Sequence, residues 1–119
     1  MFTYLVRAAY GWLVVSGVLH FIVDVVSQYV RGVREPGAAT QLYYGLNSAF
    51  AFGQFAFGLF GLLLSWLAPS VLREGPVLLM AALTGVAWLA IAFLFMDYWE
   101  PRFMVGVFCA LVGAAWLAR

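Results

Sequence analysis

Residues 8–30 read AAYGWLVVSGVLHFIVDVVSQYV, and this stretch decides the fold class. An α-helix rises about 1.5 Å per residue, so about 20 apolar residues cross the roughly 30 Å hydrocarbon core of a bilayer. The stretch is long enough, and His20 and Asp24 are its only basic or acidic side chains. It is also longer than the apolar core of a cleaved signal peptide, so it predicts a membrane-spanning helix.

Three further apolar stretches follow, at residues 41–66, 77–96 and 102–118. The last is short, but Arg102 and Arg119 flank it, and their long side chains can reach the lipid headgroups. Short polar segments separate the four stretches, and the last connection is tight enough to make the final two helices an antiparallel hairpin. The sequence therefore predicts an all-α fold: a four-transmembrane-helix bundle with short loops and no soluble domain, forming one integral membrane domain over residues 1–119.

The composition excludes several classes of protein. The 119 residues are 66% hydrophobic and 9% charged, whereas a soluble domain is about 45–50% apolar and about 25% charged. A net charge of +1 provides no basic surface for nucleic acid. One Cys and one His cannot form a disulfide or a metal site built on Cys pairs or His clusters. No nucleophile or phosphate-binding motif is present, so the sequence favours a protein that is not an enzyme. We expect a multi-pass protein of the bacterial inner membrane.

The basic residues leave the orientation in the membrane open. All six are Arg, and three lie on each predicted side of the membrane: Arg7, Arg73 and Arg119 on one, and Arg31, Arg34 and Arg102 on the other. An excess of basic residues normally marks the cytoplasmic side. One hypothesis is dual topology, in which chains insert both ways and pair as an antiparallel homodimer. The other is that partner subunits or the first helix fix a single orientation.

The polar side chains of the first helix share one face. At about 100° per residue they fall within an arc of about 120°, and they are Ser16, Gly17, His20, Asp24, Ser27, Gln28 and Arg31. Ionisable groups within a membrane span usually face protein or a water-filled cavity, because lipid exposure costs several kcal/mol. His20 and Asp24 are four residues apart and can touch. They predict a buried binding or proton-handling site, or alternatively a neutral hydrogen-bonded pair that only joins helices.

The second helix has a companion face within an arc of about 100°, formed by Tyr43, Tyr44, Asn47, Ala51, Gln54, Gly58, Gly61 and Ser65. In antiparallel helices, Asp24 and Asn47 would each lie about 9 Å below the shared end, and His20 and Gln54 about 15 and 20 Å below it. These matched depths predict a polar cavity between the first two helices. The small residues of this face are more typical of close helix packing than of ligand contact.

Two sets of site residues follow from these faces. We expect substrate or ion binding by His20, Asp24, Gln28, Asn47 and Gln54, and a pore or mouth formed by Arg31, Tyr43, Tyr44, Ser16 and Ser27. In the third helix, Trp88 is expected to pack against other helices or to line the cavity. In the last turn, Asp97 is the one acid that could reach inward.

The last helix carries a ridge of small residues, namely Gly106, Cys109, Ala110 and Gly113. Small residues allow two helix backbones to approach closely. We therefore expect this ridge to pack against another helix, either within the chain or across a dimer.

Three functions remain open at this point. The first is a small transporter or channel for a cation, a proton-coupled solute or a small polar molecule, which works as a homo-oligomer in the lipid bilayer. The second is an accessory or structural subunit of a larger membrane complex. The third is a redox subunit that binds quinone or haem between the first two helices, although two haem ligands would require His20 from each chain of a dimer.

Overall fold

The first helix of the computed structural model, which describes residues 1–119, runs without a break from Phe2 to Arg31. It consists of α1 (Phe2–His20), a π-helical turn η1 (Phe21–Val26) and α2 (Ser27–Arg31). It begins at Phe2 rather than at residue 8, because Phe2 and Val6 are buried against other helices. At its other end, Gly32 has a φ of 61°, and the amide of Val33 donates to the carbonyl of Gln28 over 3.1 Å. This left-handed glycine closes the helix.

Three more long helices follow: α3 (Ala38–Leu67), α4 (Gly75–Phe95) and α5 (Trp99–Ala118), with a 3-10 turn η2 (Val71–Arg73) before α4. The structure contains no strands, and all four helices are long and apolar enough to cross a membrane. The predicted fold class is therefore confirmed. The helices α3 and α5 each begin a few residues before the predicted apolar stretch, because hydropathy marks where lipid begins and not where a helix begins.

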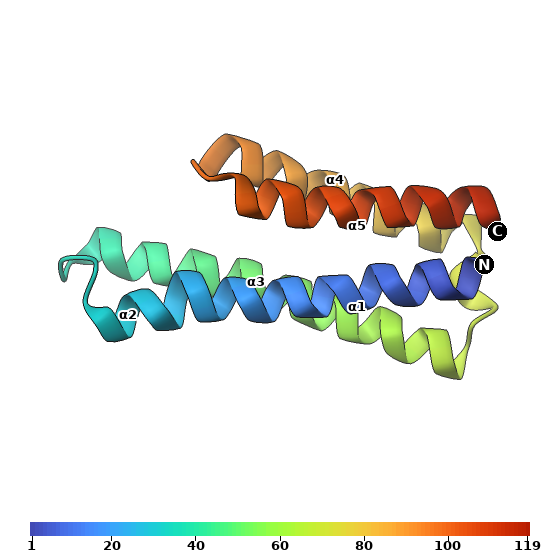
Figure 1. Ribbon diagram of the computed structural model, residues 1–119, viewed down its shortest axis with the longest axis horizontal. Coiled ribbons are helices and arrows are strands. Elements are labelled where there is room, and N and C mark those ends of the chain that lie inside the picture. Colours follow the sequence, from blue (N-terminus) through green and yellow to red (C-terminus); the bar gives the residue numbers. More distant parts are fainter.

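The central position belongs to α1, which packs against α3 on one side and α5 on the other. The third span, α4, packs against α5 and η2, so that α4 and α5 form the predicted antiparallel hairpin (Figure 1). Both chain termini and the connection between α3 and α4 lie at one end of the molecule (Figure 1). The loop between α2 and α3 lies at the other end.

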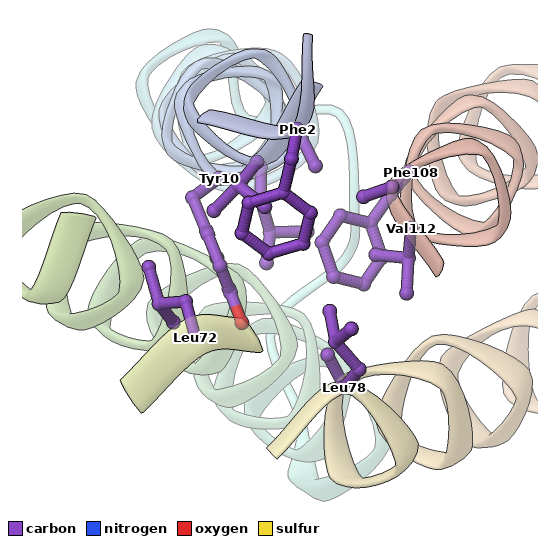
Figure 2. Close-up of a cluster of buried hydrophobic side chains, with 11 residues drawn as sticks. Phe2, Tyr10, Leu72, Leu78, Phe108 and Val112 are labelled. Atoms are coloured by element: carbon purple, nitrogen blue, oxygen red, sulfur yellow. The ribbon is translucent and has the colours of Figure 1, made fainter. Parts of the chain in front are cut away.

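The hydrophobic core fills the end that holds the termini. Side chains from every part of the bundle meet there, among them Phe2 and Tyr10 of α1, Leu72 of η2, Leu78 of α4, and Phe108 and Val112 of α5 (Figure 2). Phe108 has 0% of its surface exposed. Because this half of the bundle is filled with side chains, the large cavity described below lies towards the opposite end.

The glycines of α1 and α3 allow these two helices to touch along their backbones. A Cβ atom on Gly17 would lie 2.7 Å from the carbonyl oxygen of Ala51, and one on Gly58 would lie 2.8 Å from the carbonyl oxygen of Tyr10. A Cβ atom on Gly61 would overlap the Tyr10 ring. The expected packing role of the small residues in α3 is therefore confirmed.

The small residues of α5 behave differently. A Cβ atom on Gly106 or Gly113 would meet nothing within 4 Å, so the expectation that these two glycines pack within the chain is wrong. Only Cys109 of this ridge contacts a helix backbone: its Sγ would lie 2.8 Å from a Cβ on Gly85 of α4. The reason is that α5 turns this side, and not the two glycines, towards α4.

The four spans differ in length, and this difference places the site. The first span and α3 have 30 residues each, or about 45 Å, whereas α4 and α5 have 21 and 20 residues, or about 30 Å. The longer pair extends past the turn between α4 and α5 at the loop end (Figure 1). Because α4 and α5 match the hydrocarbon thickness, we expect the turn between them, and the part of α1 and α3 beside it, to lie near the headgroups.

Candidate functional site

A chain of hydrogen bonds joins η1 to α3. The Nδ1 atom of His20 lies 3.0 Å from a carboxylate oxygen of Asp24, and its Nε2 atom lies 2.9 Å from the Oδ1 atom of Asn47. The Nδ2 atom of Asn47 donates to the backbone carbonyl of Tyr43 over 2.9 Å. The side chains of His20, Asp24 and Asn47 are all buried. The polar side chains of the first two spans therefore meet, but Asn47 bonds to His20 and not to Asp24, whose depth it was predicted to share.

The hydrogen bonds of this network indicate which ring nitrogen of His20 carries a proton. Because the Asn47 amide group donates to a carbonyl, its oxygen faces His20, and the Nε2 atom of His20 must donate. The contact between Nδ1 and the Asp24 carboxyl then needs one more proton, carried either by His20 or by Asp24. Without that proton, two acceptors would face each other at 3.0 Å. The geometry of the pair therefore suits one shared proton.

The turn of the helix at Asp24 is a π-turn and not an α-turn. The amide of Ser27 donates to the carbonyl of Ile22, five residues earlier, which is the bonding pattern of a π-helix. Such single wide turns are rare and occur often at functional sites. A search for a 3.6-residue period does not detect such turns, so this one could not be predicted from the helical pattern.

A cavity of about 980 Å³ lies beside Asp24, at one end of this hydrogen-bond network. It is bounded by η1, α2 and α3 on one side and by the second half of α4 on the other. Its volume falls at the upper end of the range for small-molecule sites. Its polar lining consists of Asp24, Gln28, Arg34, Tyr43, Asn47, Asp97 and Tyr98. Its apolar lining consists of Leu46, Phe50, Trp88, Ile91, Phe95 and Met96. The cavity exists because α4 packs against α5 and does not cover α1 or α3 at this end.

Trp88 closes the inner end of this space. Its ring packs edge-on against Phe57 of α3 and Phe108 of α5, with centroids 5.7 and 6.3 Å apart. Both alternatives raised for Trp88 are therefore correct, because it packs and also lines the cavity.

The mouth is formed by Gln28, Arg34 and Tyr43. The side-chain amide of Gln28 donates to the Tyr43 hydroxyl over 3.3 Å, and the Nε atom of Arg34 donates to Gln28 over 3.3 Å. The guanidinium carbon of Arg34 lies 3.3 Å from the centre of the Tyr43 ring. The positive charge of Arg34 is thus held by an aromatic ring and an amide, and not by a carboxylate.

Tyr98, from the turn between α4 and α5, has the only buried side-chain polar atom without a hydrogen-bond partner. Its hydroxyl lies near the Asp24 carboxyl. Burial first, and then the charge of Asp24, raise the pKa of Tyr98 above its ordinary value. The hydroxyl is therefore placed to donate a hydrogen bond to the Asp24 carboxyl or to a ligand that binds beside it.

The structure places four of the ten predicted site residues on the cavity wall: Asp24, Gln28, Asn47 and Tyr43. His20 lies directly behind Asp24 and Asn47. Gln54 is buried but does not line the cavity, so its predicted place beside the other polar groups is wrong. At Gly17 the backbones of α1 and α3 are in close contact, and the groove beside this contact has an almost wholly apolar lining. The cavity lies in the groove that both helices form with α4, and not between them.

The other four predicted residues do not line the cavity either. The hydroxyl of Ser16 donates to the carbonyl of Trp12 over 2.7 Å, within its own helix. Arg31 donates to the carbonyl and the hydroxyl of Ser27, at 3.2 and 3.1 Å. Tyr44 packs edge-on against the rings of Tyr29 and Tyr43. Ser16, Ser27 and Arg31 are thus hydrogen-bonded within their own helix, which the position of a residue on a helical face does not reveal.

Sequence reasoning missed Arg34, Phe50 and Tyr98 as lining residues. Arg34 belongs to a loop, Phe50 belongs to a phenylalanine-rich stretch that is typical of lipid contact, and Tyr98 belongs to a short turn. Asp97 was foreseen as the acid that could reach inward, and it does line the cavity.

No known protein family, curated protein or solved structure is significantly similar to this chain. Its function must therefore be inferred from the geometry of the cavity itself.

Proposed function

We propose that this protein is a small membrane carrier that binds a solute in the cavity and couples its movement to the proton shared by His20 and Asp24. The observation that supports this function is the position of the pair. Asp24 lines a cavity large enough for a small molecule, while His20 behind it holds a proton with no other carboxyl in the network. A solute that contacts Asp24 therefore acts directly on the proton.

A carrier fits the cavity better than an open channel does. The space begins at the loop end and stops at Trp88, and beyond it the bundle is filled by buried side chains such as Phe108 and Leu13. A solute bound in the cavity reaches only one side of the membrane. Transport then requires a change of conformation or a second site that faces the other side.

A second chain in the opposite orientation would supply that second site. Each end of the helical bundle carries three Arg residues, so the charge rule gives neither orientation in the membrane an advantage. We therefore propose an antiparallel homodimer in the bilayer. An impermeant maleimide should label a Ser70→Cys chain with Cys109→Ala from both sides of the membrane. Labelling from one side only would contradict dual topology and leave the carrier proposal to the transport assay.

Transport itself can be tested in proteoliposomes that contain a pH-sensitive dye. Potassium chloride, glycine, choline chloride or phenylbutylammonium chloride is added outside, and the internal pH is followed. At least one of these solutes should cause a saturable pH change that Asp24→Asn abolishes. Glu74→Gln is the matched control, because Glu74 is an exposed carboxyl before α4, at the opposite end of the bundle, and does not line the cavity.

The Asp24→Asn and Glu74→Gln chains should both keep the helical far-ultraviolet circular dichroism spectrum of the original protein. If none of the four solutes moves protons faster than in Asp24→Asn liposomes, the carrier function is wrong for these classes of solute.

A further inference from the structure

The hydrogen-bonding groups beside Asp24 define the ligand that the cavity accepts, an inference that rests on the proposed solute site. The Asp24 carboxylate can only accept hydrogen bonds when ionised, and the unpartnered Tyr98 hydroxyl can accept or donate. Both groups line the same cavity. A ligand atom that satisfies both at once must carry at least one N–H or O–H donor.

The charges of the cavity favour a cation. Asp24 and Asp97 supply two carboxyls, and Arg34 supplies the one guanidinium. Arg34 lies at the mouth, where it stacks on Tyr43 and donates to Gln28. The shared proton leaves His20 and Asp24 together without net charge. A ligand with a positive charge at Asp24 can replace this proton and keep the net charge of the cavity unchanged.

The remaining walls are aromatic and aliphatic. Phe50, Trp88 and Phe95 line the cavity together with Ile91. Aromatic faces attract cations and provide an apolar surface for the rest of a ligand. The mouth lies near the expected level of the headgroups, where amphiphilic molecules gather. These walls suit a ligand with an apolar body and a single polar end.

Other ligand chemistries fit less well. A quinone carbonyl could accept a hydrogen bond from Tyr98, but it would then face the carboxyls of Asp24 and Asp97, which offer no donor when ionised. A carboxylate or phosphate would be repelled by the same two groups. An alkali cation would make no use of the apolar walls formed by Phe50, Trp88, Ile91 and Phe95.

We propose that the cavity binds the protonated amine of an aromatic amphiphile, with its N–H groups donating to Asp24 and Tyr98. Binding releases the proton shared by His20 and Asp24 into the solvent, one proton for each amine bound. In this exchange one hydrogen bond between His20 and Asp24 is lost, and the ammonium group takes its place at the carboxylate. No covalent bond forms, and no electron is transferred.

The test uses four probes with the same phenylbutyl body. Phenylbutylammonium carries a charge and N–H donors, phenylbutyltrimethylammonium carries a charge only, phenylbutanol is neutral, and phenylbutyrate is an anion. Binding to the purified full chain in detergent is measured near neutral pH by calorimetry in two buffers that differ in ionisation enthalpy, which also counts released protons. We expect the primary ammonium to bind at least tenfold more tightly than the other three, with release of about one proton.

Three variants assign this binding to the proposed groups. Asp24→Asn should weaken phenylbutylammonium binding at least tenfold and abolish proton release. Tyr98→Phe should weaken binding about three- to tenfold with proton release unchanged, because it removes one hydrogen bond and not the proton. Glu74→Gln, which changes an exposed carboxyl at the opposite end of the bundle, is the control and should bind like the original chain. Asp97→Asn, which changes an exposed side chain, tests the charge of the cavity without altering the buried network and should weaken binding several-fold.

Several results would overturn this assignment. These are equal affinity for phenylbutanol and phenylbutylammonium, preference for phenylbutyrate, or unchanged binding in Asp24→Asn. Failure here is separate from failure of the carrier function. If potassium or glycine moves protons in liposomes while no phenylbutyl probe binds, the ligand class is wrong and the carrier stands. If phenylbutylammonium binds with proton release but no solute changes the internal pH, the ligand class stands and transport is wrong.

Discussion

Replacing Gly17 with alanine tests the contact on which the site depends. The added Cβ atom would lie 2.7 Å from the carbonyl oxygen of Ala51 and 2.8 Å from the amide nitrogen of Phe55. Both are backbone atoms, so neither can turn away. Ordinary contacts begin near 3.4 Å, and α1 and α3 must therefore separate by about 0.7 Å. A rigid shift of this size would lengthen the bond between His20 and Asn47 from 2.9 Å to about 3.6 Å, beyond hydrogen-bond range.

The cost of overpacking at Gly17 can be separated from helix propensity by comparison with Gly11→Ala in the same helix. A Cβ atom on Gly11 would meet nothing within 4 Å. Both variants gain up to about 1 kcal/mol from the higher helix propensity of alanine. Only Gly17→Ala suffers overpacking, which costs about 1–3 kcal/mol. We therefore expect Gly17→Ala to be about 1–3 kcal/mol less stable than Gly11→Ala.

The assay is equilibrium unfolding by sodium dodecyl sulfate in mixed micelles, followed by far-ultraviolet circular dichroism. The same two variants are then compared for phenylbutylammonium binding, which the shift in Gly17→Ala should weaken. If the free energies of unfolding of the two variants agree within about 0.5 kcal/mol, the close approach of α1 and α3 is refuted. The alignment of His20 with Asn47 would then need another explanation.

Three further predictions use the same unfolding assay. Phe108→Ala should cost about 3–5 kcal/mol because its ring is fully buried, whereas the exposed Phe52→Ala should change stability by less than about 0.5 kcal/mol; similar values for both would contradict the packing of the core. Trp12→Phe should cost about 1 kcal/mol through loss of the 2.7 Å hydrogen bond from its indole N–H to a carbonyl of α5, while Trp99→Phe, exposed and without such a bond, should cost less. Tyr98 has a raised pKa in the fold, so the folded state holds this proton more tightly than the unfolded state, and stability must fall as the pH rises above the ordinary value of about 10. Tyr98→Phe should therefore lose less stability than the original chain between about pH 9 and about pH 11, and parallel curves would disprove the burial of this hydroxyl.

Much of the local structure could be predicted from the sequence. The long apolar stretches predict four spans because hydropathy and helix length depend only on consecutive residues. The helical period places His20, Asp24 and Asn47 on facing sides, and antiparallel geometry brings them to similar depths. For the same reason the small residues Gly58 and Gly61 are correctly expected to support close packing.

The cavity could not be predicted in the same way. Its far wall comes from α4, whose sequence is almost uniformly apolar and therefore gives no sign of which face points inward. The π-turn at Asp24 departs from the period on which the prediction relied. Tyr98 and Arg34 reach the cavity from a turn and a loop, whose paths depend on how the helices around them pack.

By itself the sequence determined that this is a four-helix membrane protein and that its polar residues gather on two facing helices. These properties follow from interactions between residues near each other in the chain and from the thickness of the bilayer. Only the tertiary structure decided which helices leave space beside those residues. In this protein α5, and not α4, packs against α1. The cavity beside Asp24 therefore exists because α5 occupies the position against α1 that α4 would need in order to close it.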